Sequence, residues 1–284
     1  MKLDLHLHST ASDGRLDPSD LLALAASAEL DVIALADHDT VAGVVAASRA
    51  GTELGIHVIP ALEVSCTRDD TEIHVLGYFV DPADPAISRH GEMASRMRAE
   101  RLREMVERLG DQGVQVSFDL VVEMAGKEVS SLGRPHLARA LVEAGHVDTI
   151  SEAFDRYIGN DHAAYVPTRL LTPKESIRMI QGAGGLAVWA HPPLHLLDQF
   201  LPDLVEAGLD GLEVFRPGVL PSKQRLLLTR AQGYGLVVTG GSDWHGPDDG
   251  NLGSFSVSED DVSDFLHAAG WGTPGDVAFP TGKP

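Results

Sequence analysis

Residues 2–8 read Lys-Leu-Asp-Leu-His-Leu-His, a strict alternation of apolar and ionisable side chains. Side chains two residues apart on a β-strand point to the same face. The three leucines therefore share one face, and Asp4, His6 and His8 share the other. Two imidazoles on one face can chelate one metal ion, although two partly exposed histidines on a polar face would give the same pattern. The segment predicts a strand that carries a candidate metal-binding pair.

Strand-like segments that end in histidine, aspartate or glutamate recur along the chain. Seven apolar, strand-like runs close at His6/His8, Asp37-His38-Asp39, Glu63, His74, His191, Glu213 and Asp243/His245. A buried parallel strand needs apolar residues along its length, but it does not need a metal ligand at its end. In a βα barrel these ends gather on one face, where such barrels place their chemistry. Imidazole and carboxylate groups suit Zn, Mn or Fe, so the recurrence predicts a multi-metal hydrolytic site.

Each of these residues has a structural explanation when it is taken alone. Asp13 fits an ordinary Ser-Asp-Gly turn, and Asp39 fits a helix cap. Glu63 and His74 lie between apolar neighbours, where a salt bridge or hydrogen bond would serve as well as a metal ion. Glu213 is expected to form an internal salt bridge, and support of a ligand histidine is the alternative. Their joint occurrence at seven strand ends favours the metal site.

Composition narrows the functional classes. The 284 residues are enough for one large domain or a domain with an insertion. Lys and Arg total 22 against 42 Asp and Glu, and the resulting net charge of −20 disfavours long nucleic acids. A small anionic substrate remains compatible, because divalent ions reverse the local charge. The single cysteine, Cys66, excludes an intrachain disulfide and a thiolate metal cluster. We see neither a signal peptide nor an apolar run of membrane-spanning length, so we expect a soluble cytoplasmic protein without a membrane partner.

The chain divides into two kinds of segment. Strands and helices alternate in residues 1–84 and again in residues 169–284, with strands expected at 2–8, 31–36, 57–65, 72–80, 186–190, 211–215 and 236–240. Residues 85–168 are expected to be helical, with helices near 87–109, 119–124, 135–143 and 149–157. We therefore expect an α/β fold in which a parallel barrel carries an inserted helical lid. The Gly- and Pro-rich residues 272–284 predict a loose tail.

Six motifs of this chain resemble, in the same order, those of the PHP (polymerase and histidinol phosphatase) family: HLHSTASDG, ADHDT, ALEVS, EIHVLGY, AVWAHPP and GGSDWHG. The likeness covers nearly the whole chain. The insertion, with Gly133-Arg134-Pro135-His136, resembles the branch that acts on nucleoside 3′,5′-bisphosphates and 5′-phosphorylated oligonucleotides. The resemblance implies a distorted (βα)7 barrel with up to three divalent metal ions, with Mn as the first expectation and Zn or Fe as alternatives.

Carried over motif by motif, the resemblance implies nine ligands. The first metal would be held by His6, His8, Glu63 and Asp243. The second would be held by Glu63, His74 and His191, with Glu63 bridging the two. The third would be held by Asp13, His38 and His245. Every ligand position is filled, which argues against an inactive relative; Ala36 and Ala61 depart from the usual Thr and Gly but supply no ligand.

Candidate catalytic residues are Glu63, His38, His245 and Asp39. The insertion offers cations for a substrate phosphate, and Arg134 is the leading candidate because an arginine at a helix start is well placed for bidentate contact. His136, Arg98 and Arg101 are further candidates. For the arginines of residues 96–103, the alternative is a solvated helix face paired with neighbouring glutamates.

We expect a metal-dependent phosphoesterase that removes the 3′-phosphate of nucleoside 3′,5′-bisphosphates and also acts on short 5′-phosphorylated oligonucleotides. An activated water would attack phosphorus in line, and the group that protonates the leaving oxygen stays open. The alternatives are a histidinol-phosphate phosphatase, a metal-binding module of a DNA polymerase, and a non-catalytic nucleotide-binding metal module.

Overall fold

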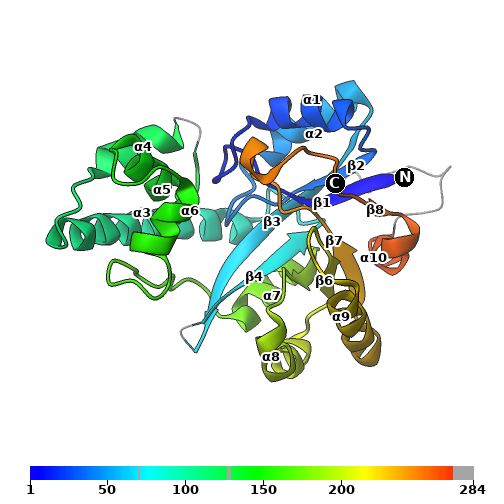
Figure 1. Ribbon diagram of the computed structural model, residues 1–284. Helices are drawn as coiled ribbons and strands as arrows, with labels where there is room; N and C mark the ends of the chain where they lie inside the picture. Colours follow the sequence, from blue (N-terminus) through cyan, green and yellow to red (C-terminus); the bar gives the residue numbers. More distant parts are fainter. Residues whose placement is uncertain (70, 127–128, 271–284) are drawn as a thin grey trace.

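The computed structural model describes residues 1–69, 71–126 and 129–270, and the tail expected at residues 272–284 lies outside them. One curled sheet organises the chain (Figure 1), and its strands lie side by side in the order β7-β6-β5-β4-β3-β2-β1-β8. The strands are β1 (Lys2–Leu7), β2 (Val32–Leu35), β3 (His57–Arg68), β4 (Thr71–Tyr78), β5 (Leu186–Trp189), β6 (Gly211–Phe215), β7 (Val237–Gly240) and β8 (Val257–Ser258).

The sheet nearly closes into a barrel. The amide of His8 donates to the carbonyl of Trp244 over 3.1 Å, and the amide of Asp243 donates to the carbonyl of His6 over 2.9 Å. These bonds join the end of β1, which is next to the last strand in the order, to the segment that follows β7 at the opposite end. The expected α/β barrel of seven strands is confirmed, and the short β8 adds an antiparallel pair to β1.

Helices cover the outside of the barrel: α1 (Pro18–Ser27), α2 (Val44–Leu54), α7 (Pro173–Gly182), α8 (Leu194–Ala207), α9 (Pro221–Tyr234) and α10 (Ser263–Ala268). Two of them begin as the sequence predicts. The Asp17 carboxylate accepts from the amide of Ser19 at the start of α1. Thr172 and Glu175 form a reciprocal capping box at the start of α7, which satisfies amides that the helix leaves free. In the part of the chain that the structure describes, no helix is both long and apolar enough to cross a membrane.

Strand β4 departs from the parallel sheet that we expected. It pairs antiparallel with both β3 and β5. The physical reason is the missing helix between β3 and β4, because a parallel neighbour needs a long crossover connection. In this hairpin His74 lies opposite Ser65. The beginning of β4 thus meets the C-terminal half of β3, which brings His74 to the same end of the barrel as Glu63.

The inserted segment is helical, as expected. It contains α3 (Pro85–Asp111), α4 (Phe118–Ala125), α5 (Arg134–Glu143), α6 (Ile150–Ala153) and the π-helix η1 (Phe154–Ile158). Figure 1 shows these helices grouped beside the barrel. They share a hydrophobic cluster of their own, whose buried members all lie between Leu102 and Ala164. This separate core supports our interpretation of residues 85–168 as a distinct helical unit.

Both faces of β1 are buried. Leu3, Leu5 and Leu7 pack in hydrophobic clusters, and Asp4, His6 and His8 are also 0% exposed. The alternative of two partly exposed histidines is therefore excluded. Three buried ionisable side chains on one strand need polar partners, because burying them unpaired would be costly.

The barrel closure depends on Gly241. A β-carbon built there would lie 2.3 Å from Cβ of His6 and 2.5 Å from its amide nitrogen. Gly241→Ala should therefore push β1 away from the segment after β7 and lower the free energy of unfolding by about 1–3 kcal/mol. Gly182→Ala is the matched control, because a β-carbon there meets nothing within 4 Å. Urea unfolding with chelator present is the measurement, and equal midpoints for the two variants would contradict the close approach.

Candidate metal centre

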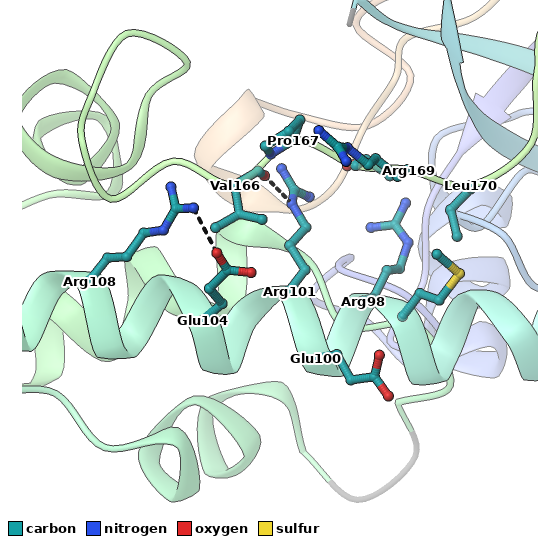
Figure 2. Close-up of a pocket in the computed structure, with 11 residues that line it drawn as sticks. Arg98, Glu100, Arg101, Glu104, Arg108, Val166, Pro167, Arg169 and Leu170 are labelled. Atoms are coloured by element: carbon teal, nitrogen blue, oxygen red, sulfur yellow. Dashed lines mark hydrogen bonds and ion pairs between the residues drawn. The ribbon is translucent and has the colours of Figure 1, made fainter.

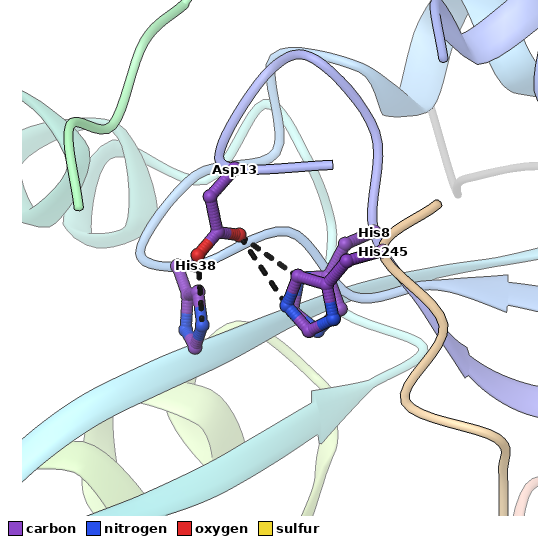
Figure 3. Close-up of side chains that lie close together, drawn as sticks. All are labelled: His8, Asp13, His38 and His245. Carbon is purple, nitrogen blue, oxygen red and sulfur yellow. Dashed lines mark ion pairs between the residues drawn. The ribbon is translucent and has the colours of Figure 1, made fainter. Parts of the chain in front are cut away.

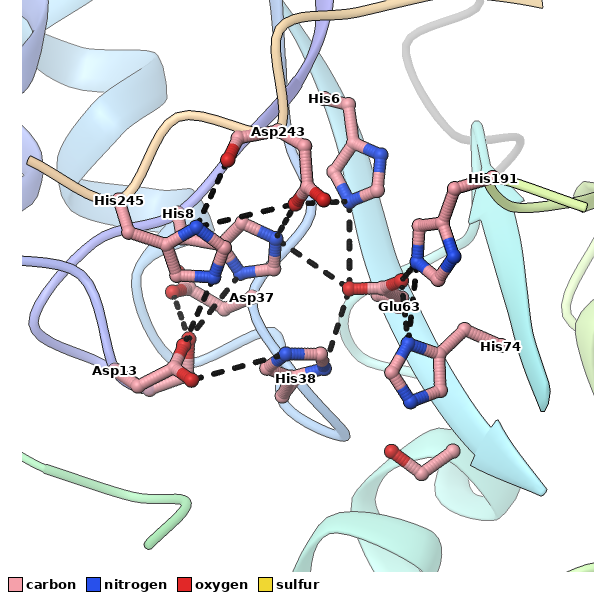
Figure 4. Close-up of polar contacts among 12 residues, drawn as sticks. His6, His8, Asp13, Asp37, His38, Glu63, His74, His191, Asp243 and His245 are labelled. Carbon is pink, nitrogen blue, oxygen red and sulfur yellow. Dashed lines mark hydrogen bonds and ion pairs between the residues drawn. The ribbon is translucent and has the colours of Figure 1, made fainter. Parts of the chain in front are cut away.

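The Glu63 carboxylate lies at the centre of a cluster of histidines and carboxylates at one end of the barrel (Figure 4). Its Oε2 atom lies 3.3 Å from Nε2 of His6, 3.4 Å from Nε2 of His8 and 3.2 Å from Nδ1 of His38. Its Oε1 atom lies 2.9 Å from Nδ1 of His74 and 2.8 Å from Nε2 of His191. One carboxylate thus faces five imidazole rings.

The first ligand group consists of His6, His8, Glu63 and Asp243, whose ligand atoms all lie within 4.8 Å of one another. His6 and His8 come from β1, and Asp243 follows β7. The Oδ1 atom of Asp243 lies 3.4 Å from Nε2 of His6 and 3.3 Å from Nε2 of His8. The barrel closure places these strands side by side, so residues at the two ends of the strand order share one site.

The second group surrounds the other oxygen of Glu63. His74 lies with Glu63 and His38 inside the same 4.8 Å limit. His191, which follows β5, completes the surroundings, because its Nε2 atom lies 3.2 Å from Nδ1 of His74. The structure therefore brings together the three residues expected at the second metal, and it adds His38 beside them.

The third group consists of His8, Asp13, His38 and His245 (Figure 3). Asp13 lies in the loop after β1, His38 follows β2, and His245 follows β7. The Asp13 carboxylate lies 3.5 Å from Nε2 of His245, 3.8 Å from Nε2 of His38 and 3.8 Å from Nδ1 of His8. The three residues expected at the third metal are thus neighbours, and His8 connects them to the first group.

These residues fit divalent metal ions. Several of their atoms are buried and have no hydrogen-bond partner: His6 Nε2, His8 Nε2, His38 Nδ1 and Glu63 Oε2. Buried polar atoms without a partner are rare and costly. Here they face one another across 3.2–3.4 Å, an arrangement in which a cation between them would satisfy all of them. Imidazole and carboxylate ligands suit Zn, Mn or Fe, and the donor set alone does not distinguish these metals.

Charges within the cluster shift the pKa values of its members. Burial alone would raise the pKa of Glu63, but the neighbouring imidazoles, with His38 and His74 foremost, lower it well below its usual range. Burial lowers the pKa of His8, yet its hydrogen bonds to Asp243 and Glu63 outweigh burial and raise that pKa to about 10. The same opposition raises the pKa of His74 to about 10. Protons on His8 and His74 offset the carboxylate charge when no metal is bound.

Two glutamates contact candidate ligand histidines at the ring nitrogen that faces away from Glu63. Glu213 in β6 lies 2.9 Å from Nδ1 of His6 and accepts from the amide of His191 over 2.7 Å. Its ion pair with Arg216 is longer, at 3.8 Å, so the expectation of a plain internal salt bridge is corrected. Glu72 lies 3.3 Å from Nε2 of His74. In both rings the opposite nitrogen faces Glu63, which is the arrangement that orients metal-binding histidines.

Glu72 was missed in the sequence, although its i−2 spacing from His74 on β4 was an available signal. Asp37, in contrast, lay in a quoted motif without an assigned role. Its carboxylate accepts hydrogen bonds from the amide and hydroxyl of Ser9 and from the hydroxyl of Ser12. It thereby fixes the loop that carries Asp13.

Asp39 does not join the cluster. Its carboxylate lies 2.8 Å from Nε of Arg98 and 2.9 Å from Nε2 of His90, and it accepts from the amide of Ser65. Burial would raise the pKa of Asp39, but Arg98 and His90 hold it below its usual range. We therefore replace the expected catalytic role with a structural one, in which Asp39 ties α3 to the barrel. Arg98 is likewise committed to this contact.

Three residues of this region have left-handed backbone conformations without being glycine. The φ angles are 56° at Asp39, 31° at His191 and 58° at Asp243. Such conformations are costly for residues with a β-carbon, and in folded proteins they gather at functional sites. Here they turn the chain sharply at strand ends, so that His191 and Asp243 point at Glu63.

Two of the substrate candidates, Arg98 and Arg101, line a cavity of about 340 Å³ between α3 and residues 166–170. Figure 2 shows Arg98 and Arg101 rising from α3 towards this segment, with Arg169 across from them. Arg101 donates from Nε to the carbonyl of Val166 over 2.6 Å. The expectation of a solvated helix face is thus corrected for Arg98 and Arg101, which are 5% and 8% exposed.

Arg134 and His136 lie at the start of α5, outside that cavity wall. The Arg134 guanidinium donates to the side-chain oxygen of Asn160 and lies 5.2 Å from the centre of the Tyr165 ring. Arg101 lies 5.6 Å from the centre of the same ring, so the two arginines are neighbours. His136 is buried and accepts from the amide of Gly133 at the start of the helix, which gives it a structural task.

Known proteins resemble this chain in sequence and in fold. The family profile described as "PHP domain" matches residues 4–159. A 5′-3′ exoribonuclease of Haemophilus influenzae is 34% identical over 87% of this chain and 90% of its own length. A 3′,5′-nucleoside bisphosphate phosphatase of Chromobacterium violaceum is 31% identical over 87% of this chain and 88% of its own. A crystal structure from Bifidobacterium adolescentis, described as a candidate metal-dependent phosphoesterase, has a TM-score of 0.85 and 36% identity, and the match covers 93% of this chain and 95% of that one. The chain therefore belongs to the PHP family of metal-dependent phosphoesterases.

Proposed function

We propose that this phosphoesterase hydrolyses the 3′-phosphate of nucleoside 3′,5′-bisphosphates to give nucleoside 5′-monophosphates, and that it also accepts short 5′-phosphorylated oligonucleotides. The observation that carries the proposal is a basic cavity beside the metal centre. The names of the two relatives, a bisphosphate phosphatase and an exoribonuclease, are consistent with such substrates.

The basic cavity stands out in an acidic protein. The chain has a net charge of −20, yet the charged residues that line this cavity are mostly basic. They are the arginines Arg98, Arg101, Arg108 and Arg169 and the glutamates Glu100 and Glu104. Arg98 is paired with Asp39, and Arg108 is paired with Glu104. The Nη2 atom of Arg101 is buried without a hydrogen-bond partner. An anion in the cavity would supply that partner.

Arg134 adds a second positive charge next to Arg101. Burial is the main cause that lowers the pKa of Arg101 to about 10; Glu72 opposes this shift, and the charges of Arg134 and Arg98 contribute to it. Arg101 nevertheless stays protonated at neutral pH. Two cations that share one aromatic neighbour form a site suited to a phosphate, because guanidinium groups bind phosphate oxygens in pairs.

The cavity lies one side chain away from the metal centre. Glu72 lies 4.0 Å from Nη2 of Arg101 and 3.3 Å from Nε2 of His74. A substrate with two phosphates one ribose apart could therefore place its 5′-phosphate at the arginines and its 3′-phosphate at the metal ligands. The remote phosphate would then supply binding energy that positions the reacting one.

Divalent ions in the cluster would activate water for in-line attack and neutralise the non-bridging phosphate oxygens. The protein's own residues prepare the site for this step. Glu213 and Glu72 hold the rings of His6 and His74, and Glu63 stands between the first two ligand groups. His38 and His245, which border Asp13, are the candidate donors of a proton to the leaving 3′-oxygen.

Histidinol phosphate fits this site less well. It carries one phosphate and an ammonium group, and the arginines of the cavity would repel that ammonium. The same positive charge attracts the second phosphate of a bisphosphate. The charge of the cavity therefore decides between the two phosphatase functions.

Glu63→Gln tests the metal centre. We expect the wild-type protein to bind up to three divalent ions per chain, and we expect the variant to lose the ions that Glu63 bridges, because it removes the shared negative charge. Activity should fall by more than about 100-fold, since even outer partners of ligands are worth 10–100-fold. Metal analysis, circular dichroism and phosphate release with Mn added after chelation are the measurements. Glu53→Gln, on the exposed face of α2, is the control; full activity of the chelated, metal-free wild type would refute the metal centre.

Arg134→Ala tests the remote phosphate. The variant should lose about 1.5–3 kcal/mol of transition-state binding for adenosine 3′,5′-bisphosphate. It should be nearly unchanged on 3′-AMP, which lacks the 5′-phosphate. Values of kcat/KM for both substrates give the comparison, with Arg96→Ala on the exposed side of α3 as the matched control. Equal losses on both substrates would mean that Arg134 acts on the fold or on the reacting phosphate.

A substrate panel tests the proposed activity itself. Turnover of adenosine 3′,5′-bisphosphate, 3′-AMP, 5′-AMP and histidinol phosphate is compared under identical Mn conditions. We expect the bisphosphate to have the highest kcat/KM and 5′-AMP to accumulate as product, because only the bisphosphate occupies both anion sites. A far higher efficiency with histidinol phosphate would establish the alternative phosphatase function instead.

A further inference from the structure

A second and larger cleft borders the metal centre on a different side from the basic cavity. Its volume is about 950 Å³, and Asp13 and His245 of the third ligand group form part of its wall. The opposite wall comes from α4, α5 and the start of α6. The linings of the two openings share no residue. The second cleft therefore reaches the cluster directly at Asp13 and His245, whereas the Glu72 side chain lies between His74 and Arg101 of the basic cavity.

The charge of this second cleft is opposite to that of the basic cavity. Besides Asp13, its lining holds two arginines and five carboxylates: Arg15 and Arg139 against Glu123, Glu143, Asp148, Asp248 and Asp249. Both arginines are already engaged. Arg139 donates to the carbonyl of Asp13 over 2.6 Å, and Arg15 lies 3.4 Å from Asp248. The excess negative charge of the lining is thus not offset within the cleft.

Three of these carboxylates form what we call the rim carboxylates: Glu123, Glu143 and Asp148. Their side chains are exposed, and in the described part of the chain they have neither a hydrogen bond nor an ion pair. Glu123 lies in the last turn of α4 and Glu143 is the last residue of α5. A carboxylate at a helix C-terminus opposes the helix dipole. The positions of Glu123 and Glu143 are therefore unfavourable for their helices, and no local contact compensates for this.

The reaction on an oligonucleotide determines what this cleft would meet. With the first nucleotide in the basic cavity, water adds its oxygen to the phosphorus of the first linkage. The bond from phosphorus to the 3′-oxygen breaks, that oxygen takes a proton, and the remainder of the chain departs with a 5′-phosphate. The remainder extends from the phosphorus away from the first nucleotide. The second cleft reaches the cluster at Asp13 and His245, which form part of its wall.

We propose that the second cleft receives the part of an oligonucleotide on the 3′ side of the scissile phosphate, and that the rim carboxylates make a substrate of two nucleotides preferred over longer ones. The inference rests on the proposed function. A dinucleotide with a 5′-phosphate places an uncharged nucleoside in the cleft. A trinucleotide adds one more phosphate, which faces the rim carboxylates. Repulsion by three screened charges at about 8–10 Å amounts to roughly a 3- to 10-fold loss.

The test compares kcat/KM for the 5′-phosphorylated dinucleotide pApA and trinucleotide pApApA. The wild type should prefer pApA by about 3- to 10-fold. The variant Glu123→Gln/Glu143→Gln/Asp148→Asn should bring this ratio close to one, while kcat/KM for adenosine 3′,5′-bisphosphate stays unchanged. The matched control is Glu107→Gln/Asp111→Asn/Glu206→Gln, which removes three exposed carboxylates near other helix C-termini. It should keep the wild-type ratio although its net charge equals that of the first variant.

The ionic strength provides a second measurement that needs no variant. Raising it from about 0.05 M to about 0.5 M should reduce the preference of the wild type for pApA, because salt screens the rim charges. Equal cleavage of pApA and pApApA by the wild type at low salt would overturn the inference. Loss of the preference in the control variant would also overturn it, because overall charge would then be the cause. Failure to hydrolyse the bisphosphate would instead overturn the proposed function, and this inference with it.

Discussion

The burial of one carboxylate among five imidazoles is the constraint on which this structure depends. Glu63 is 0% exposed, and its two oxygens face His6, His8 and His38 on one side and His74 and His191 on the other. Such a group is stable only when positive charge surrounds it. Protons on the imidazoles or divalent ions between the ligands provide that charge. The histidines and carboxylates around Glu63 therefore lie together at one end of the barrel, where the ends of its strands meet.

The rest of the barrel holds this cluster in place. Bonds between the end of β1 and the segment after β7 close the sheet, and Gly241 permits the close approach. Glu213 and Glu72 fix ligand rings, and Asp37 fixes the loop of Asp13. The helical insertion is tied to the same region by the contact of Arg98 with Asp39. A single polar network thus joins the barrel, the metal ligands and the insertion.

The basic cavity and the second cleft, which both lie near the metal centre, carry opposite charge. The basic cavity offers arginines, among them an unpartnered nitrogen of Arg101, whereas the second cleft carries an excess of carboxylates. The overall charge of −20 hides this contrast. Such a site would favour a substrate that has a phosphate at the end near the arginines and an uncharged group at the end near the carboxylates. Under the proposed function, the local placement of charge matters more for the choice of substrate than the net charge of the chain.

The sequence by itself determined the barrel and the approximate helix bounds, because strand alternation, Asp17 and Thr172 caps and apolar runs are local signals. It also indicated candidate ligands at the strand ends, since strand ends in a barrel meet on one face, and the resemblance of its motifs to a known family implied the set of nine. Only the tertiary structure decided the antiparallel direction of β4, the support of His6 by Glu213, the structural role of Asp39 and the burial of Arg101 Nη2 without a hydrogen-bond partner. Each of these depends on partners far apart in the chain: Glu213 lies 207 residues from His6, and Arg98 lies 59 from Asp39. The local sequence pattern does not predict such pairs, because they form only when the whole chain packs together.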